Sequence, residues 1–152
     1  MGVVISALSA AREMCALSDW CLTNLELQKM LYLSQMVYMG EHNGEPLFNG
    51  HFEAWDYGPV LPEVYSRARA FGSAPIMDVF SGARPIIDEE RRKFLARAYQ
   101  QLSTRTAADL VNITHWSKGA WYKHYRPDAK GTMIPDGDIF KEAKDRIAAR
   151  RG

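Results

Sequence analysis

The sequence predicts a mainly α-helical protein, a single compact domain over residues 1–152 with about six helices and a small extended or hairpin segment near residues 46–56. Apolar residues recur at helical spacing over most of the chain. Glycines and prolines gather in the stretches between those helices and mark turns there. A chain of 152 residues, 47% of them hydrophobic, can also bury a core without a disulfide or a metal.

Two helices are predicted in the N-terminal part of the chain. The first covers residues 3–17, and its apolar face is made of Val4, Leu8, Ala11 and Cys15. Thr23 begins the second helix, and Glu26 completes a capping box three residues later. Apolar residues cover nearly every face of the second helix over residues 25–39, so we expect it to be the centre of the core. Gly40 is expected to end it.

The stretch that follows is rich in glycine, proline and aromatic residues. The turn signals Asn43-Gly44 and Asn49-Gly50 separate two extended pieces, residues 47–48 and 51–55, which suggest a small hairpin. Pro62 suits the first turn of a third helix, which Gly72 closes after Phe71. The loop over residues 73–87 carries enough apolar residues to pack against the domain.

The C-terminal half predicts three more helices. Asp88 caps the first of them, whose apolar stripe is made of Phe94, Leu95, Ala98, Tyr99 and Leu102. The next runs from about Thr106 to His115, and an irregular aromatic stretch, residues 116–125, follows it. Residues 131–134 have a weakly extended pattern, and the last helix begins near Asp136 or Asp138.

Charge and cysteine usage narrow the class of protein. The net charge is +1 without a long run of like charge, which argues against a nucleic-acid partner. No apolar run approaches the roughly 20 residues of a membrane span, so no membrane partner is expected. Cys15 and Cys21 are the only cysteines, and two isolated cysteines in a domain with its own core are typical of a reduced, cytoplasmic protein.

No cofactor, metal or catalytic motif stands out. The four histidines and two cysteines lack the spacing of a metal site. Phosphate-binding glycine loops and nucleophile motifs are missing from the sequence. Glu53, Asp56 and His115 are the residues an enzyme would use, but nothing in the sequence brings them together, and solvation or helix capping explains them better. We therefore expect a protein that is not an enzyme.

Aromatic residues in loops and at helix edges are the clearest sign of a binding surface, because Trp and Tyr bury a large area at low entropic cost. Trp55 and Trp121 lie between tight turns and are interpreted as anchors, so Trp55→Ala should cost about 3 kcal/mol or more. Tyr57→Ala should cost little stability and more binding. The residues predicted to contact a partner are Asp56, Tyr57, Tyr65, Trp116 and Tyr122.

Several blocks of the sequence resemble the Panacea domain family, a large set of bacterial and phage-associated proteins. They are LTNLELQKMLYLSQ (22–35), PLFNGHFEAWDYGPVLPEVY (46–65), the Phe71-Gly72 ending, LVNITHWSKGAW (110–121), and Ile134 with the helix after it. Together they cover nearly the whole chain. The residues that match the family pattern are Gln28, Lys29, Tyr32, Glu53, Ala54, Trp55, Gly58, Pro59, Val60, Pro62, Tyr65, Thr114, His115 and Trp121.

The resemblance implies an antitoxin that binds and neutralises a cognate protein toxin. For some members it implies an adaptor that delivers the toxin to a AAA+ protease such as ClpXP. Because such a domain meets many different toxins, we expect most matching residues to be scaffold and their variable neighbours to contact the partner. Two alternatives stay open: a DNA-binding regulator of its own operon, and an enzyme that uses Glu53, Asp56 and His115.

Overall fold

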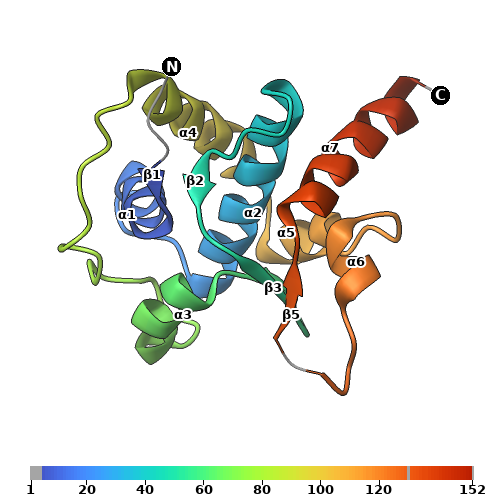
Figure 1. Cartoon of the computed structure of the whole chain (residues 1–152). Coiled ribbons are helices and arrows are strands. Elements are labelled where there is room, and N and C mark those ends of the chain that lie inside the picture. The colour runs from blue at the N-terminus through green and yellow to red at the C-terminus, as the bar shows by residue number, and fades with distance from the viewer. Residues whose placement is uncertain (1–4, 130, 152) are drawn as a thin grey trace.

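The computed structural model describes residues 5–129 and 131–151, and most of these residues are helical. The described part of the chain contains seven α-helices and one short 3-10 helix, η1, which extends α3 (Figure 1). They are α1 (Ala7–Leu17), α2 (Asn24–Glu41), α3 (Pro62–Ala68), η1 (Arg69–Phe71), α4 (Glu89–Leu102), α5 (Ala107–Thr114), α6 (Ala120–His124) and α7 (Asp136–Arg151). The mainly α-helical fold class is thus confirmed, with α6 in addition to the predicted helices.

Helix α2 is the centre of the core, as the sequence predicts. Figure 1 shows it in the middle of the molecule, with α1 and α4 on one side and α5 and α7 on the other. Most of its 18 residues are buried, including polar Gln28, Lys29 and Gln35. The capping box predicted at its start is present, because Glu26 N donates to Thr23 Oγ1 at 3.2 Å and Thr23 N donates to Glu26 Oε1 at 3.0 Å.

The strands form two small sheets. In the first, β1 (Ile5–Ser6) pairs in parallel with β2 (Phe48–Asn49). In the second, β3 (Phe52–Trp55) lies between β4 (Gly58–Val60) and β5 (Thr132–Ile134), antiparallel to both. The predicted extended segment near residues 46–56 is confirmed by β2 and β3, but the suggested hairpin within it was wrong. Its two extended pieces belong to different sheets, and the hairpin turn lies one strand later, at Asp56 and Tyr57.

Two predicted helix ends also differ. Helix α1 begins at Ala7 with Ser6 as its N-cap, and residues 3 and 4 of the predicted start lie outside the described residues. Helix α2 continues past Gly40 to Glu41. Gly40 serves helix packing instead of capping, because an added Cβ would lie 2.9 Å from Ala143 Cβ on α7. Chain reversal occurs at Gly44, whose φ is +90°.

Helix α6 forms within the stretch that was expected to be irregular. Its first backbone amide, on Ala120, donates a 2.9 Å hydrogen bond to Glu142 Oε1 on α7. Because an unpaired amide at a helix start is costly when buried, this distant carboxylate stabilises the short helix. Residues 131–134 were correctly predicted to be extended, since β5 covers three of them.

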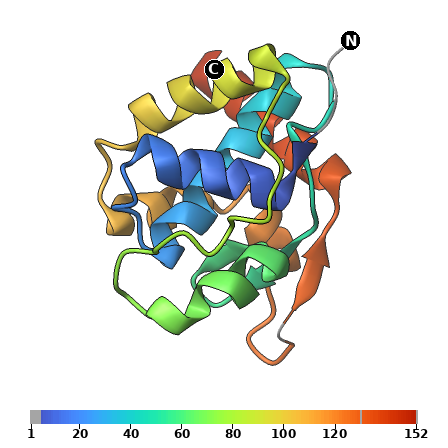
Figure 2. The ribbon, with the colours of Figure 1, turned by 90° about the vertical axis from the view of Figure 1, so that its left-hand side faces the viewer.

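The long segment between η1 and α4 packs against the domain, as predicted. Figure 2 shows it running over α1. Ile76 and Phe80 are buried in the core, and Ser9 Oγ on α1 donates a 2.7 Å hydrogen bond to the carbonyl of Arg84. Of the segment's large apolar residues, Met77 and Ile87 remain exposed. Within the described residues, no helix has both the length and the apolarity needed to cross a bilayer.

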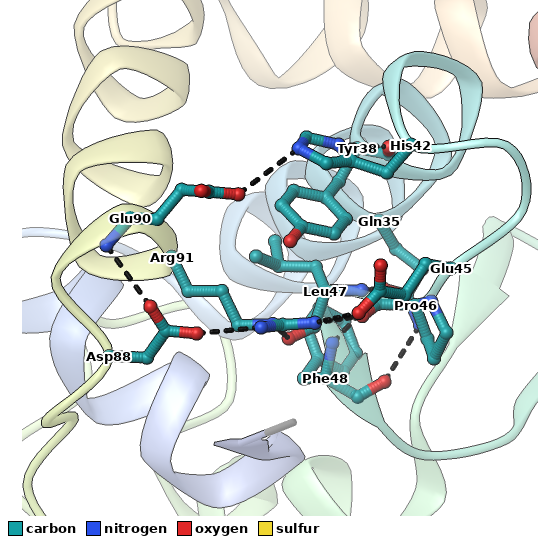
Figure 3. Close-up of polar contacts among 10 residues, drawn as sticks. All are labelled: Gln35, Tyr38, His42, Glu45, Pro46, Leu47, Phe48, Asp88, Glu90 and Arg91. Carbon is teal, nitrogen blue, oxygen red and sulfur yellow. Dashed lines mark hydrogen bonds and ion pairs between the residues drawn. The ribbon is translucent and has the colours of Figure 1, made fainter. Parts of the chain in front are cut away.

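A buried arginine ties α4 to the chain before β2 (Figure 3). Arg91 is 1% exposed, donates to the carbonyls of Leu47 and Pro46, and pairs with Asp88 and Glu45. Burial alone would lower the pKa of Arg91, but the hydrogen bonds to the two carboxylates outweigh burial and raise it. The network holds the backbone ahead of β2 against the start of α4.

Candidate partner-binding site

A hollow of about 530 Å³ opens at the N-terminal end of α2, next to the β3–β4 turn. We call it the aromatic pocket. Side chains from α2, β3, the turn, α3 and the segment after α6 converge on it. Its lining comprises Asn24, Leu25, Gln28, Lys29, Ala54, Trp55, Asp56, Tyr57, Val60, Tyr65, Gly72, Tyr125, Arg126 and Pro127. The site therefore brings together residues that are up to about a hundred positions apart in the sequence.

Gln28 and Lys29 form the inner wall of the pocket from α2. Gln28 accepts the backbone N–H of Leu61 at 2.8 Å, and Lys29 Nζ donates to the carbonyl oxygen of Pro59 at 2.9 Å. Both side chains thus hold the backbone of β4 and its exit against α2. Lys29 is fully buried, and this burial lowers the pKa of its ammonium group from 10.5 to about 7.

Gly58 and Pro59 allow that close approach. The φ of Gly58 is +118°, a conformation that residues with a side chain rarely adopt. An added Cβ would lie 2.8 Å from Lys29 Cε and 3.1 Å from Thr114 Oγ1. Gly58 is therefore required both by the turn and by the lysine beneath it. Pro62 begins α3, as the sequence predicts.

The β3–β4 turn packs against the end of α5 and against α6, through Thr114, His115 and Trp121. Thr114 Oγ1 donates to the carbonyl of Val111 at 2.9 Å, and His115 is the C-cap of α5, as predicted. The His115 ring stacks on Trp121 with centroids 3.8 Å apart. Trp121 Nε1 donates to the carbonyl of Trp55 at 2.7 Å, so this buried tryptophan anchors the end of β3.

His115 differs from a charged residue at a helix end, because its pKa is lowered. Burial lowers its pKa and the nearby charge of Lys29 lowers it further, whereas the backbone of Tyr57 opposes both. Its Nε2 is buried without a hydrogen-bond partner of normal geometry among the described residues. Burial thus favours the neutral imidazole, which stacks on Trp121.

Trp55 and Tyr65 form one side of the pocket. Trp55 is partly buried, packs edge-on against Tyr65 with centroids 4.7 Å apart, and donates from Nε1 to Glu53 Oε1 at 2.9 Å. Glu53 and Trp55 share a face because they are two residues apart on β3. Ala54 on the opposite face is buried.

The outer rim of the pocket is polar and aromatic. Tyr57 is 71% exposed at the turn. Its neighbour Asp56 accepts a 2.5 Å hydrogen bond from the hydroxyl of Tyr125, and this bond raises the pKa of Tyr125. Asp56, Tyr57 and Tyr65, three of the residues predicted to contact a partner, thus line one pocket.

The other two predicted contact residues lie outside that lining. Trp116 is partly buried between α5 and α6, with the Arg146 guanidinium 4.8 Å from its ring centroid. Tyr122 is 56% exposed on α6. Their proposed role in binding therefore requires a contact area that extends beyond the pocket.

Tyr32 is held in position by Glu142, a residue that the sequence analysis did not select. Its hydroxyl donates to Glu142 Oε1 at 2.6 Å, and Glu142 is 1% exposed. Burial and the neighbouring carboxylate raise the pKa of Tyr32 well above its ordinary value. Arg146 Nε completes the cluster by donating to Glu142 Oε2 at 2.7 Å.

Three missed residues share a signal that was present in the sequence. Arg91 lies three positions before Phe94, on the apolar stripe of α4, and Glu142 lies three positions after Ile139 on α7. Gln35 lies within the all-round apolar part of α2 and accepts the backbone N–H of Leu47 at 2.7 Å. A polar residue on a buried stripe must find a partner, so each position predicts a buried polar contact.

The residues proposed for an enzyme make separate contacts. Among the described residues, no hydrogen bond or ion pair joins any two of Glu53, Asp56 and His115, and each has a different neighbour. In the same part of the chain, no group of three or more His, Cys, Asp or Glu residues could hold a metal ion.

Comparison with known proteins shows which protein family the chain belongs to. The family model described as "Antitoxin SocA-like, Panacea domain" matches residues 27–122, which is more than half of the chain. The chain belongs to this Panacea-domain family. The matched region of the Panacea domain begins within α2 and ends within α6, so it contains most of the aromatic pocket.

A curated relative agrees with this assignment. The chain is 34% identical over 119 residues to Antitoxin SocA of Caulobacter vibrioides (strain NA1000 / CB15N). The matched region covers 72% of this chain and 63% of the relative, so the chain spans less than two thirds of that protein. No solved structure gave a significant match to this Panacea domain.

Proposed function

We propose that this chain is an antitoxin that binds and neutralises a cognate protein toxin, and that the aromatic pocket receives the toxin. Membership of the SocA-like antitoxin family carries the proposal. The name of the curated relative supports it.

The pocket has the physical features of a protein-binding site. Its inner wall is rigid, because Lys29 and Gln28 hold β4 in place through hydrogen bonds to backbone atoms. Its rim presents Tyr57 and Leu25, two of the large apolar side chains that the domain leaves exposed. Rigid pockets rimmed by aromatic residues are where binding energy concentrates in protein interfaces. We therefore expect the toxin to insert an apolar side chain between Tyr57 and Tyr65.

The same domain would also act as an adaptor that delivers the bound toxin to a AAA+ protease such as ClpXP. This step needs a second surface that stays free when the toxin occupies the pocket. The basic end of α7, with Arg150 and Arg151, is one candidate for contact with the protease.

Binding and neutralisation are tested by co-expression with the protein encoded by the adjacent gene. The wild-type domain should relieve the growth arrest caused by that protein and should co-purify with it. Tyr57→Ala should weaken both effects. Met77→Ala is the matched control, because Met77 is 70% exposed, as against 71% for Tyr57, and lies on a different segment. Absence of both a complex and rescue would refute the proposed function.

The amount of toxin in the cell distinguishes neutralisation by binding from delivery of the toxin to a protease. If the domain is an adaptor, the toxin should disappear faster when the domain is present, and only in cells that contain ClpXP. A toxin that stays abundant but inactive would exclude the adaptor step and leave neutralisation by binding intact. Tyr122→Ala in the same assay tests whether the contact area reaches α6.

A further inference from the structure

The second half of α2 lies at the bottom of a surface depression that is separate from the aromatic pocket. One hollow of about 300 Å³ lies between α2 and α4, and another of about 170 Å³ lies between α2 and α7. Val37 and Glu41 line both hollows, so the two are neighbours on either side of one exposed ridge of α2. We call this double hollow the α2 groove.

The bottom of the depression, which includes the ridge and which we call the floor of the groove, is apolar. The sequence predicted that this part of α2 would be buried in the core. Val37 is 41% exposed, although residues on nearly every other face of α2 are buried. Ile147 on α7 lines the same hollow and is 43% exposed. Leu33 and Leu102 line the hollow toward α4. An exposed apolar ridge between two hollows is the form of a surface that buries a partner helix.

The rim of the groove carries more positive than negative charge. Arg97 lines one hollow and Arg150 the other, and neither forms an ion pair with another described residue. A third arginine, Arg146, is already paired with Glu142 at 2.7 Å. Glu41 is the acidic residue of the lining. The charge of the rim therefore complements an acidic partner.

We propose that the α2 groove docks an acidic amphipathic helix of a partner protein. Packed helices lie about 8–10 Å apart, so the hollows on the two sides of α2 are separated by about the same distance. Side chains at positions i and i+7 of a helix are about 10.5 Å apart along its axis, which matches that separation. The bound helix crosses α2 with an apolar residue in each hollow, a small residue over Val37, and carboxylates near Arg97 and Arg150.

The groove and the aromatic pocket can be occupied together. The pocket uses Asn24, Leu25, Gln28 and Lys29 from the first half of α2, and the groove uses α2 residues from Leu33 onward. A domain with two such surfaces can hold two proteins at once, which is what delivery of a toxin to a second protein requires. The docking proposal itself does not depend on the toxin, because its test uses the domain alone.

The test measures binding of a synthetic helix to the purified chain of 152 residues. The probe is a fluorescein-labelled 18-residue alanine-based peptide with leucines at i and i+7, alanines between them on that face, and glutamates on both flanks. A second peptide replaces the glutamates with lysines. In a fluorescence anisotropy titration, the acidic peptide should bind roughly tenfold more tightly than the basic peptide, a difference of about 1.4 kcal/mol.

Two variants of the domain connect this binding to the groove. Val37→Asp should weaken binding of the acidic peptide at least about tenfold. Ile87→Asp is its matched control and should leave binding unchanged, because Ile87 is an exposed apolar residue that lines neither hollow. The double variant Arg97→Glu with Arg150→Glu leaves the apolar floor intact and should reverse the preference, so that the basic peptide binds more tightly. Far-ultraviolet circular dichroism establishes that each variant is folded.

Several results would overturn the proposal. Equal affinity for the two peptides would refute the charge argument, and failure of the acidic peptide to bind would refute the docking surface. Undiminished binding by Val37→Asp would place the peptide elsewhere. If sedimentation of the wild-type chain shows a dimer that Val37→Asp dissociates, a second copy of the chain occupies the groove and the proposed partner is wrong.

Discussion

Lys29 Nζ donates a 2.9 Å hydrogen bond to the carbonyl oxygen of Pro59, in a part of the core where the lysine is fully buried. In the part of the chain that the structure describes, this nitrogen donates to a backbone carbonyl and forms no ion pair with a carboxylate. Burial without an opposite charge disfavours the ammonium form, which is why the pKa falls to about 7. The contact fastens the β4 backbone, and with it the β3–β4 turn, to α2.

Replacing Lys29 should therefore change how stability depends on pH. The pKa is about 7 in the folded chain and 10.5 in the unfolded chain, so between these values the unfolded chain binds a proton that the folded chain does not. Stability should rise with pH through this window by up to about 1.4 kcal/mol per pH unit. Lys29→Met should remove this rise in urea unfolding at pH 7.5 and 9.5. Lys118→Met, at an exposed lysine, should retain it.

Gly58→Ala should destabilise the domain by about 1–3 kcal/mol, because it adds a Cβ at a positive φ and against a packed side chain. The nearest atom would be Lys29 Cε at 2.8 Å. Gly82→Ala is the matched control, since an added Cβ there has no atom within 4 Å among the described residues. Thermal melts of the two variants measure the difference, and equal melting temperatures would contradict the role assigned to Gly58.

Arg91→Met should be among the most damaging substitutions on α4, at about 3–5 kcal/mol, because it leaves the buried partners of a charged group unpaired. Asp88 is 10% exposed and loses the guanidinium that lowers its pKa. The neighbouring Arg92 is 50% exposed and pairs with Glu89 on the surface. Arg92→Met should cost less than about 1 kcal/mol in the same denaturant titration.

Tyr32→Phe removes a single oxygen atom and leaves Glu142 with one donor fewer. Since Glu142 is 1% exposed, water cannot easily replace the lost hydroxyl. A hydrogen bond to a charged group contributes about 1.5–3 kcal/mol, and we expect a loss of that size by chemical denaturation. Tyr122→Phe serves as the control, because this tyrosine is 56% exposed and water can hydrate its hydroxyl. Similar losses in both variants would argue against the Glu142 cluster.

Trp55→Ala and Tyr57→Ala should separate stability from binding. Trp55 packs against Tyr65 and hydrogen-bonds Glu53, so its loss should cost about 3 kcal/mol. Tyr57 is 71% exposed, and its loss should change stability by less than about 0.5 kcal/mol while weakening toxin binding. Melting curves in the reverse order would refute the assignment of Trp55 as anchor and Tyr57 as contact.

Local sequence rules predicted the elements of this fold well. The capping box at Thr23 and Glu26, the cap at Asp88 and the start of α3 at Pro62 each depend on residues within one helical turn. The central position of α2 followed from its all-round apolar composition. The strand pairing did not follow, because β3 pairs with β5 about eighty residues away, and no local pattern encodes that register.

The candidate site shows the same division between local and distant contacts. Sequence reasoning selected Asp56, Tyr57 and Tyr65 from their place in one aromatic stretch, and these residues do line one pocket. It did not select Tyr125 as a contact residue, although the Tyr125 hydroxyl donates to Asp56 from 69 positions away. It also placed Trp116 and Tyr122 with the others, but neither residue lines the pocket, because their place relative to the β3–β4 turn depends on how distant segments pack.

The sequence by itself therefore determined most of the helical segments, the caps that begin several of them, and which helix lies at the centre; it did not determine α6 or the start of α1. Tertiary structure alone decided which polar groups are buried together, as with Lys29 and Pro59 or Tyr32 and Glu142. It also decided that Val37 stays exposed on an otherwise buried helix. The physical reason is the distance along the chain over which each interaction acts. Capping and periodicity act over one or two turns, whereas burial and hydrogen-bond partners depend on segments that meet only when the whole chain is packed.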